Sequence, residues 1–360
     1  MPPPRAATPV AKDRLPPFPS RVVAWQRRHG RNDLPWQASR DPYRIWLSEI
    51  MLQQTQVATV LPYYERVVAA FPDVAALASA PIGRVLELWA GLGYYRRAHH
   101  LHAAARAVVD RHGGKFPRSP EALAALPGVG RSTAAAIAAF AFGVRGAILD
   151  GNVKRVLARH RGVEGFPGEA AVERRLWAAA EALLPARGIE RYTQGLMDLG
   201  ATLCTRSRPR CADCPVAVDC VARIEGRVDR LPSPRPRRLL PRRETHVLVI
   251  ERAGEILFER RAPTGVWPGL WSLPELAIDD DVGQALRKRF GVEAAAIEPL
   301  APIEHGFTHF TLTIRPLRVA VRRAPSRVAF EERIWLARDD ALGAALPAPI
   351  KRLLRTLSRN

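Results

Sequence analysis

Cysteines and long hydrophobic runs are scarce in this 360-residue chain, and both shortages narrow its possible functions. No run of about 18 apolar residues occurs, so we expect neither a membrane-spanning helix nor a membrane partner. The first 20 residues are rich in proline and lack the apolar stretch of a signal peptide, so we expect a cytoplasmic protein without a secretory signal. Hydrophobic residues still make up 47% of the chain, which excludes wholesale disorder and allows the two domains that its length predicts.

Positive charge, in contrast, is abundant. Lys and Arg total 55 against 35 Asp and Glu, a formal net charge of +20, and only five of the basic residues are lysine. A polyanionic partner, above all a nucleic acid, would account for this charge. A GC-rich genome would also produce an arginine-, alanine- and proline-heavy composition, so the charge alone leaves both explanations open.

Hydrophobic periodicity divides the chain into four parts. Residues 1–19 are proline-rich and predict a disordered tail. Residues 20–222 predict a helical domain, with helices at 42–53, 56–71, 82–89, 97–111, 134–142, 173–183 and 192–203. Residues 223–244 are dominated by proline and arginine and predict a connector. Residues 245–360 predict an α+β domain, with strands at 245–251, 255–260, 309–316 and 317–321 and helices at 282–290 and 349–357.

The four cysteines lie together, as Cys204, Cys211, Cys214 and Cys220, and none occurs elsewhere. Without a secretory signal, such clustering favours a metal site over disulfides. The spacing C-x6-C-x2-C-x5-C has a single C-x2-C pair and no histidine among the cysteines, which is unusual for zinc. Four thiolates on one loop favour a [4Fe–4S] cluster, while zinc and structural thiols stay open as alternatives.

A glycine turn, Leu126-Pro127-Gly128-Val129-Gly130, joins two helical patterns. Two glycines permit a tight turn with exposed backbone N–H groups, which can bind a phosphate at the start of a helix without reading sequence. A plain helix–helix connection would explain the same residues.

Two acidic residues stand in apolar surroundings. Glu49 has Ile45 and Leu52 as neighbours at helical spacing, and burial there would raise its pKa and suit it to donate a proton. Asp150 follows an apolar run and could face a cleft, or could simply cap the helix that begins near Val153. One protonated and one charged carboxyl group are what cleavage of a glycosidic bond requires. Excision of a purine base poses the same problem, with N7 receiving the proton.

The stretches 34–37, 41–43, 46–57, 91–95, 126–130 and 148–155 and the four-cysteine loop resemble those of the bacterial MutY-like adenine DNA glycosylases, within the helix–hairpin–helix glycosylase superfamily. The resemblance implies a monofunctional enzyme of base excision repair, which flips adenine mispaired with 8-oxoguanine or guanine out of the duplex and excises it. It implies an all-α glycosylase domain, with a six-helix barrel at about 34–144 and an iron–sulfur subdomain formed by 20–33 and 145–222. One [4Fe–4S] cluster on the four cysteines is implied, and the resemblance also allows a monovalent cation at the glycine turn. The implied partner is double-stranded DNA with 8-oxoG·A or G·A mispairs, bound by a monomer.

The resemblance also implies roles in the reaction. Glu49 would protonate adenine N7, Asp150 would stabilise the oxocarbenium ion, and Asn152 would help to hold the nucleotide and the attacking water. Ser132 stands where endonuclease III-like relatives carry a lysine nucleophile. A hydroxyl cannot form an imine, so no efficient lyase activity at the abasic site is expected.

Further residues would contact the DNA or the base. Gln54 and Tyr94 match residues that wedge into the duplex, and the turn Pro127, Gly128, Val129 and Gly130 would bind the backbone. The adenine pocket would be formed by Trp36, Gln37, Leu52 and Gln194, whose amides could read a base edge.

The second domain resembles a Nudix fold, through residues 260–274. A working Nudix hydrolase needs a glutamate-rich helix that binds Mg²⁺, and the corresponding segment 284–291 has no carboxylate. The domain is therefore expected to recognise 8-oxoguanine rather than to hydrolyse a nucleotide. The loop that senses 8-oxoguanine, usually Phe-Ser-His, is Phe307-Thr308-His309 here, so the hydroxyl is kept and a methyl group is added.

Three other functions compete with this interpretation. An endonuclease III-like enzyme for oxidised pyrimidines is disfavoured by Ser132 and by the second domain. A non-catalytic iron–sulfur DNA-binding protein is disfavoured by the presence of both Glu49 and Asp150. A Nudix hydrolase with a DNA-binding appendage is disfavoured by the missing glutamates.

Overall fold

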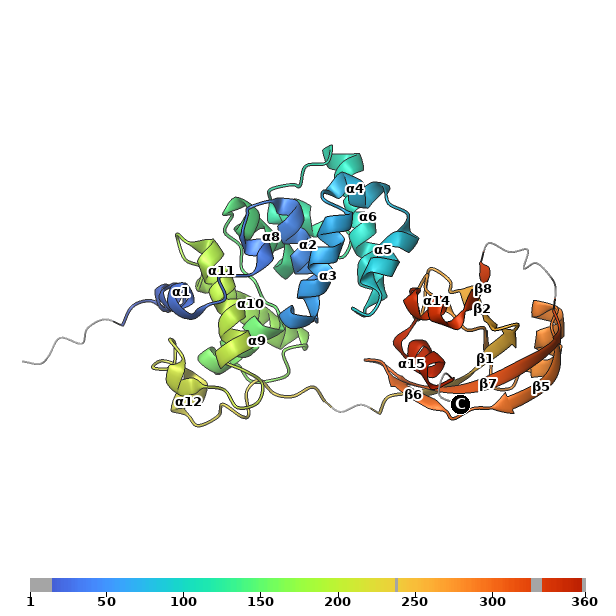
Figure 1. Cartoon of the computed structure of the whole chain (residues 1–360). Coiled ribbons are helices and arrows are strands. Elements are labelled where there is room, and N and C mark those ends of the chain that lie inside the picture. Colours follow the sequence, from blue (N-terminus) through green and yellow to red (C-terminus); the bar gives the residue numbers. More distant parts are fainter. Residues whose placement is uncertain (1–14, 237–238, 325–331, 358–360) are drawn as a thin grey trace, which may run out of the picture. The chain divides into compact units, whose positions relative to one another are not determined.

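The computed structural model describes residues 15–236, 239–324 and 332–357 (Figure 1). Its contacts divide the chain into two units. The first joins the residues up to 49 with 116–125 and 129–236, and the second joins 50–115 and 126–128 with the residues from 237 onward. Within the described ranges, no helix is long and apolar enough to cross a membrane.

The first unit is helical. Its helices are α1 (Phe18–His29), most of α2 (Pro42–Leu52), α7 (Pro120–Ala124), α8 (Arg131–Phe142), α9 (Gly151–Arg161), α10 (Ala170–Ala182), α11 (Ile189–Asp198) and α12 (Val221–Ile224), with short turns at Pro35–Gln37 and Cys211–Asp213. A π-helical turn, Leu199–Leu203, continues α11 toward the cysteines. The core includes Phe18, Val22, Leu157, Leu176 and Leu196.

Helix α1 begins inside the segment that the sequence predicts to be a disordered tail. Residues 1–14 lie outside the described residues, but Phe18 and Pro19 are already helical. Phe18 is buried in the core and its ring meets that of His160 at 4.5 Å, so burial of this aromatic side chain fixes the start of the helix. The predicted domain start at residue 20 is therefore two residues late.

Helix α8 is built almost entirely of small apolar residues and is buried along most of its length. Alanine side chains permit close approach of neighbouring chain segments, and the Cα of Gly146 lies so near Ala135 that an added Cβ would be 3.0 Å from the alanine Cβ. The helix predicted at 134–142 is confirmed, with its start three residues earlier at Arg131. Helix α8 thus places Ser132, in its first turn, beside the segment that leads into Asp150.

The helices of the second unit are α3 (Val57–Ala70), α4 (Val74–Ser79), α5 (Ile82–Trp89) and α6 (Tyr95–His112). Helices α4 and α5 both pack on α6, and Leu77, Leu86, Trp89 and Leu101 are buried there. Two exposed turns precede α3 and α6, and they carry Gln54 and Tyr94.

The same unit contains a mixed sheet, whose described strands are β1 (Arg242–Arg252), β2 (Glu255–Arg260), β3 (Trp271–Ser272), β4 (Glu275–Leu276), β5 (Glu293–Pro299), β6 (Ile303–Gly306), β7 (Thr311–Arg323) and β8 (Arg333–Ala337). The central order is β3-β2-β1-β7-β5, and only the β1–β7 pair is parallel. A helical segment, α13 (Val282–Ala285) with its π-helical continuation Leu286–Phe290, places Leu286 and Phe290 in the core with Leu248 and Val319. Helices α14 (Arg338–Gly343) and α15 (Ala348–Thr356) follow.

Strand β7 corrects one prediction. The sequence predicts two separate strands, at 309–316 and 317–321. The structure has one strand through Pro316. On one side, β7 changes partner here, from β6 up to Ile314 to β5 from Leu317. The carbonyl of Pro316 accepts a bond from Leu300 on that side, so the absent N–H falls where the partner strands change and costs no regular ladder bond.

Candidate active site

Glu49 lies near the end of α2, on a helix whose other inward positions are apolar. Ile45, Trp46 and Ile50 are buried, while the Glu49 side chain keeps intermediate exposure. Burial, and to a smaller extent the charge of Asp150, raise the pKa of Glu49 to about 8. Glu49 is therefore protonated at neutral pH and can donate that proton.

Asp150 is held at the start of α9. One carboxylate oxygen accepts the backbone N–H of Val153 at 2.7 Å, so the residue is an N-cap as well as a neighbour of Glu49. Burial raises the pKa of Asp150, whereas the N–H groups of Val153 and Asn152 and the charges of Arg155 and Lys154 oppose that rise. Glu49 has no comparable donors among the causes of its shift, so a proton shared by the pair resides on Glu49.

Ser132 and Lys154 both have defined structural partners. The hydroxyl of Ser132 accepts the backbone N–H of Leu149 at 2.9 Å, which ties the first turn of α8 to the residue before Asp150. The amine of Lys154 pairs with Glu173 at 2.8 Å. The hydroxyl therefore helps to position Asp150, and the amine nearest to the site in sequence is already engaged.

Asn152 connects the carboxylate region to the cysteine loop. Its side-chain oxygen accepts a bond from Arg155 at 2.8 Å, and Arg155 also donates to the carbonyls of Gly200 and Cys204, both at 2.7 Å. An added Cβ on Gly200 would lie 2.6 Å from the Cβ of Asn152, so this close approach requires glycine.

The four cysteines surround one small cavity, together with the apolar side chains Val156, Leu199 and Leu203. Arg159 places a guanidinium nitrogen 3.3 Å from Cys204 Sγ and donates to the carbonyl of Thr205 at 2.7 Å. Burial raises the pKa of Cys214 to about 12, and the other three cysteines add to the rise. Within the described residues, no three His, Cys, Asp or Glu side chains converge on one point as ligands of a single ion do. This lining fits an iron–sulfur cluster, since four soft sulfur donors surround an apolar cavity beside an arginine. Positive charge on the iron would favour the thiolate form of the cysteines over the thiol.

Three of the four residues predicted for the adenine pocket line a second cavity, of about 600 Å³. They are Trp36, Gln37 and Gln194, and Ile45 and Phe140 contribute apolar wall. Leu52, the fourth predicted residue, is not among the residues that line it. The lining is mixed, because charged side chains such as Arg40, Glu190 and Arg191 and several amides share it with these apolar residues. Amide groups beside an aromatic wall can pair with the edge of a planar heterocycle.

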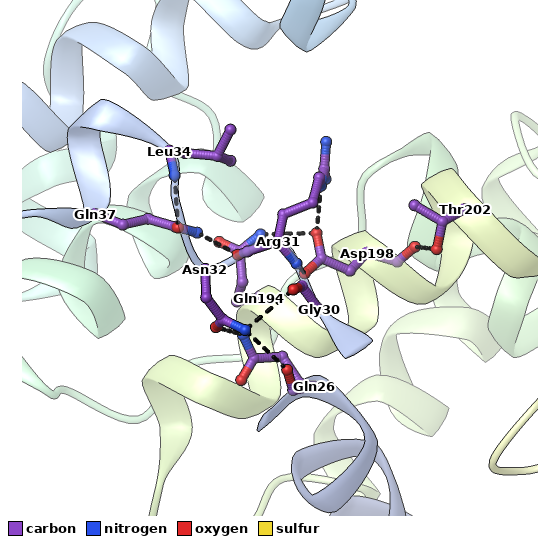
Figure 2. A network of polar contacts seen from close by, with 9 residues as sticks. All are labelled: Gln26, Gly30, Arg31, Asn32, Leu34, Gln37, Gln194, Asp198 and Thr202. Carbon is purple, nitrogen blue, oxygen red and sulfur yellow. Dashed lines mark hydrogen bonds and ion pairs between the residues drawn. The ribbon is translucent and has the colours of Figure 1, made fainter. Parts of the chain in front are cut away.

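A hydrogen-bond network, partly buried, supports this cavity (Figure 2). Gln37 accepts the backbone N–H of Leu34 at 3.2 Å and donates to the carbonyl of Arg31 at 3.0 Å. Gln194 donates to Asp198 at 2.9 Å, and Asp198 forms an ion pair with Arg31 at 2.7 Å. Sequence reasoning missed Asp198 and Arg31. The one available signal was the four-residue spacing of Gln194 and Asp198 on a helix, within the apolar stretch around Leu196.

The two predicted wedge residues lie on exposed turns with left-handed backbone. Gln54 has φ +57° and Tyr94 has φ +50°, and the Tyr94 side chain is 51% exposed. Such backbone is uncommon for residues other than glycine and often marks a functional position. Arg97, which is buried, donates to the carbonyls of Met51 and Gln53 and to the Thr55 hydroxyl, and so holds the turn around Gln54.

The glycine turn presents its backbone but not all of its side chains. Gly128 and Gly130 are exposed and Pro127 is half-buried, while Val129 is buried and anchors the turn. Gly128 has φ +75°, and an added Cβ would lie 2.7 Å from His100, so only glycine fits. Gly130 is the N-cap of α8, and it places this helix start, which has no side-chain cap, where it could face an anion.

Phe307, Thr308 and His309 form the tip of the β6–β7 hairpin, closed by a bond from the Phe307 N–H to the Phe310 carbonyl at 2.8 Å. Phe307 stacks on Phe310 with ring centroids 4.5 Å apart and also meets Trp267. Thr308 and His309 are exposed. The aromatic residues therefore hold the tip rigidly while two polar side chains face solvent.

The Nudix-like helical segment 282–290 carries no carboxylate, as the sequence indicates. Three aspartates, 279–281, precede it, and the last of them, Asp281, accepts the backbone N–H of Gln284 at 2.8 Å and serves as its N-cap. Arg289 extends to Glu259 at 2.7 Å. The segment thus stabilises the sheet domain and offers no acidic set for Mg²⁺.

Comparisons with known proteins agree with this architecture. The family model for HhH-GPD superfamily base excision DNA repair proteins matches residues 47–182, and the NUDIX domain model matches residues 245–356. The adenine DNA glycosylase of Buchnera aphidicola subsp. Acyrthosiphon pisum is 31% identical, over 95% of this chain and 98% of the relative. That of Mus musculus is 35% identical, over 94% of this chain and 77% of the relative. A solved thermostable thymine-DNA glycosylase is 31% identical with a TM-score of 0.53, over 58% of this chain and 95% of that one.

The predicted fold class, a helix–hairpin–helix glycosylase domain followed by a Nudix-like domain, is thereby confirmed. A [4Fe–4S] cluster is typical of endonuclease III-like members of this superfamily.

Proposed function

The chain belongs to the adenine DNA glycosylases of base excision repair, and we propose that it excises adenine mispaired with 8-oxoguanine or guanine and leaves an abasic site. The observation that carries this proposal is the pair Glu49 and Asp150. Burial raises the pKa of both carboxyl groups, but only at Asp150 do N–H donors and nearby cations oppose that rise, so a shared proton resides on Glu49. An N-glycosidic bond breaks through an oxocarbenium-like transition state, so it needs an acid at the leaving base and an anion beside the sugar.

In the proposed reaction, Glu49 protonates N7 of adenine and withdraws electrons from the bond to the sugar. Asp150, held by the N-terminus of α9, stabilises the positive charge that develops on the sugar. Asn152 helps to hold the nucleotide and the attacking water. The glycosidic bond breaks and adenine leaves with the proton from Glu49. Water adds to C1′ as the new hydroxyl and gives its other proton to the Glu49 carboxylate, which restores the acid.

The base must leave the duplex before Glu49 can reach it. We propose that Gln54 and Tyr94 wedge into the duplex from their strained turns, while the backbone of 127–130 binds a phosphate, with room for a monovalent cation. Trp36, Gln37, Leu52 and Gln194 would receive the flipped adenine. Three of them line the same cavity, which supports their grouping.

Two further parts complete the proposal. Cys204, Cys211, Cys214 and Cys220 would hold one [4Fe–4S] cluster, which when bound would brace the loop that Arg155 and Arg159 join to α9. Phe307, Thr308 and His309 would contact 8-oxoguanine from the hairpin tip. The protein would act as a monomer on double-stranded DNA.

We also propose that the enzyme is monofunctional. Ser132 bonds the main chain instead of offering an amine, and the amine of Lys154 is held by Glu173. Neither group is available to form an imine with the abasic sugar.

Single-turnover cleavage of a duplex with one 8-oxoG·A pair tests the function. We expect strand breaks only after alkali treatment, and breaks without alkali would contradict the monofunctional proposal. Glu49→Gln should abolish excision while binding is kept, because the amide has the same shape but no proton to give. Retained excision by this variant would reject Glu49 as the acid. A thymine-glycol duplex serves as the control for endonuclease III-like activity, and we expect no cleavage.

A further inference from the structure

A buried carboxylate that takes no part in the proposed reaction lies next to the candidate adenine cavity. Asp198, at the end of α11, is 1% exposed and accepts three hydrogen bonds (Figure 2). They come from Arg31 Nε at 2.7 Å, the Arg31 backbone N–H at 2.9 Å, and Gln194 Nε2 at 2.9 Å. Asp198 does not line the cavity, but Gln194 does.

The partner of Gln194 fixes the orientation of its amide. A side-chain amide has one accepting end and one donating end of nearly equal shape, so its neighbours decide which way it points. A carboxylate paired with a guanidinium can only accept, and Asp198 therefore holds the NH₂ end of Gln194. The carbonyl oxygen Oε1 is the end of Gln194 that is left for a ligand in the cavity.

Gln37, the other of the two cavity amides predicted to contact adenine, is fixed in a different way. Its carbonyl oxygen accepts the Leu34 N–H, and its NH₂ donates to the Arg31 carbonyl. Both ends are thus held by main-chain groups, and the orientation does not depend on a carboxylate. Of the two amides, Gln194 is the one whose hydrogen-bonding character a single side chain determines.

We propose that Asp198 is a positioning residue that sets base specificity through the orientation of Gln194. The inference rests on the proposed excision of adenine and names what selects that base. Adenine carries a donor, the amino group, at position 6, whereas hypoxanthine carries an acceptor oxygen there. The accepting Oε1 of Gln194 can form a hydrogen bond with the amino group of adenine. Opposite hypoxanthine it faces another acceptor oxygen, and two acceptors that face each other in a desolvated pocket lower the excision rate.

The wild-type protein tests the orientation without any substitution. Single-turnover excision is measured for adenine, unsubstituted purine and hypoxanthine, each opposite 8-oxoguanine and each normalised to acid depurination of the same nucleotide. We expect adenine to be fastest, purine slower and hypoxanthine slowest. Hypoxanthine faster than purine would show a donor facing the base and would overturn the proposal. A wild-type protein that excises no adenine would instead reject the proposed function.

Asp198→Asn tests the positioning residue itself. The asparagine oxygen can keep one bond from Arg31, while its NH₂ meets Gln194 and turns the Gln194 amide so that its own NH₂ faces the cavity. We expect the ratio of adenine to hypoxanthine excision to fall about tenfold, the equivalent of ~1.4 kcal/mol. Asp198→Glu, which restores an acceptor-only group, should recover part of the ratio. Equal losses on both bases for Asp198→Asn would mean a structural role only.

Two controls separate this effect from general damage to the fold. Thr202→Val removes a hydroxyl that donates to the main-chain carbonyl of Asp198 at 2.8 Å and leaves the carboxylate alone, so the ratio should not change. Gln194→Ala removes the amide, and adding Asp198→Asn to it should change the ratio no further. A further change in that background would show that Asp198 acts by another route.

Discussion

At the scale of single residues, environment rather than residue type separates the roles of the two central carboxyl groups. Glu49 stands on an apolar helix face, where burial and the charge of Asp150 both raise its pKa. Burial raises the pKa of Asp150 as well, but this residue caps α9, where backbone N–H groups and nearby cations oppose the rise. The proposed acid and the proposed charge stabiliser follow from these surroundings.

The raised pKa of Glu49 makes stability depend on pH. A carboxyl group with a folded pKa of about 8 and an ordinary unfolded value near 4.5 binds more protons in the folded state between these values, so its contribution to the free energy of unfolding falls as pH rises. Glutamine has no charge to bury. We therefore expect Glu49→Gln to be more stable than the wild type, by a margin that grows from pH 5 to pH 8.

Urea unfolding at pH 5, 6.5 and 8 measures this difference in the free energy of unfolding. The same variant should lose activity, so the glutamate would favour function at the expense of stability. Glu173→Gln is a suitable control, since it alters an exposed carboxylate that pairs with Lys154. A margin that stays constant or shrinks with pH would contradict a buried, protonated Glu49.

At the scale of elements, local pattern predicts the helices well and the sheet less well. The helix predicted at 82–89 is α5 with the same bounds, because its apolar residues follow helical spacing and one face is buried. The two-residue strands β3 and β4 carry no period, and they exist only because β2 and β1 lie beside them. Strand pairing over long sequence separations leaves no local signal.

Arg97 is an element-scale feature that the sequence does not indicate. Its guanidinium donates to Met51 in the last turn of α2 and to Gln53 and Thr55 just beyond it. The same group lies over the rings of Trp89 and Tyr94. Burial lowers its pKa to about 10, so it stays charged at neutral pH. One side chain thus joins the turn of Gln54 to the turn of Tyr94.

We expect Arg97→Met to lower the free energy of unfolding by about 2 kcal/mol, since it leaves the carbonyls of Met51 and Gln53 without their donor. Arg96→Met is the matched control, because Arg96 is the exposed neighbour on the same helix, and its effect should stay within about 0.5 kcal/mol. Urea unfolding compares the two. Equal effects would show that the buried hydrogen bonds contribute little.

At the scale of the whole molecule, the residues that we propose to react could be named from the sequence, whereas the residues that support them could not. An acid on an apolar helix face is visible in sequence, and so are Asp150 and the cysteine loop. The Asp198–Arg31 pair joins residues 167 positions apart, and Arg97 bonds across 46 positions to Met51. Such contacts form only when the chain has folded. From the sequence alone, a charged residue is expected to be exposed to solvent.

The net charge is distributed unevenly along the chain, which suggests that its parts contribute differently to DNA binding. Residues 1–222 carry a net +12, 223–244 carry +5, and 245–360 carry only +3. Salt-dependent attraction to phosphates should therefore come from the first two parts. The hairpin tip, with exposed Thr308 and His309, should add base contacts with little bulk charge.

We therefore expect His309→Ala to lower the preference for 8-oxoG·A over G·A duplexes several-fold while the salt dependence of binding stays unchanged, because a base contact releases no counterion. Arg235→Ser, at an exposed position of the connector, should weaken binding to both duplexes alike and reduce the salt slope by about one if this arginine meets a phosphate. Fluorescence anisotropy at several salt concentrations measures both quantities. Two outcomes would contradict a base contact at the tip. The His309→Ala variant could keep its preference for 8-oxoG·A, or it could lose affinity for both duplexes equally with a smaller salt slope. Either result would show that the tip binds by charge and does not sense the oxidised base.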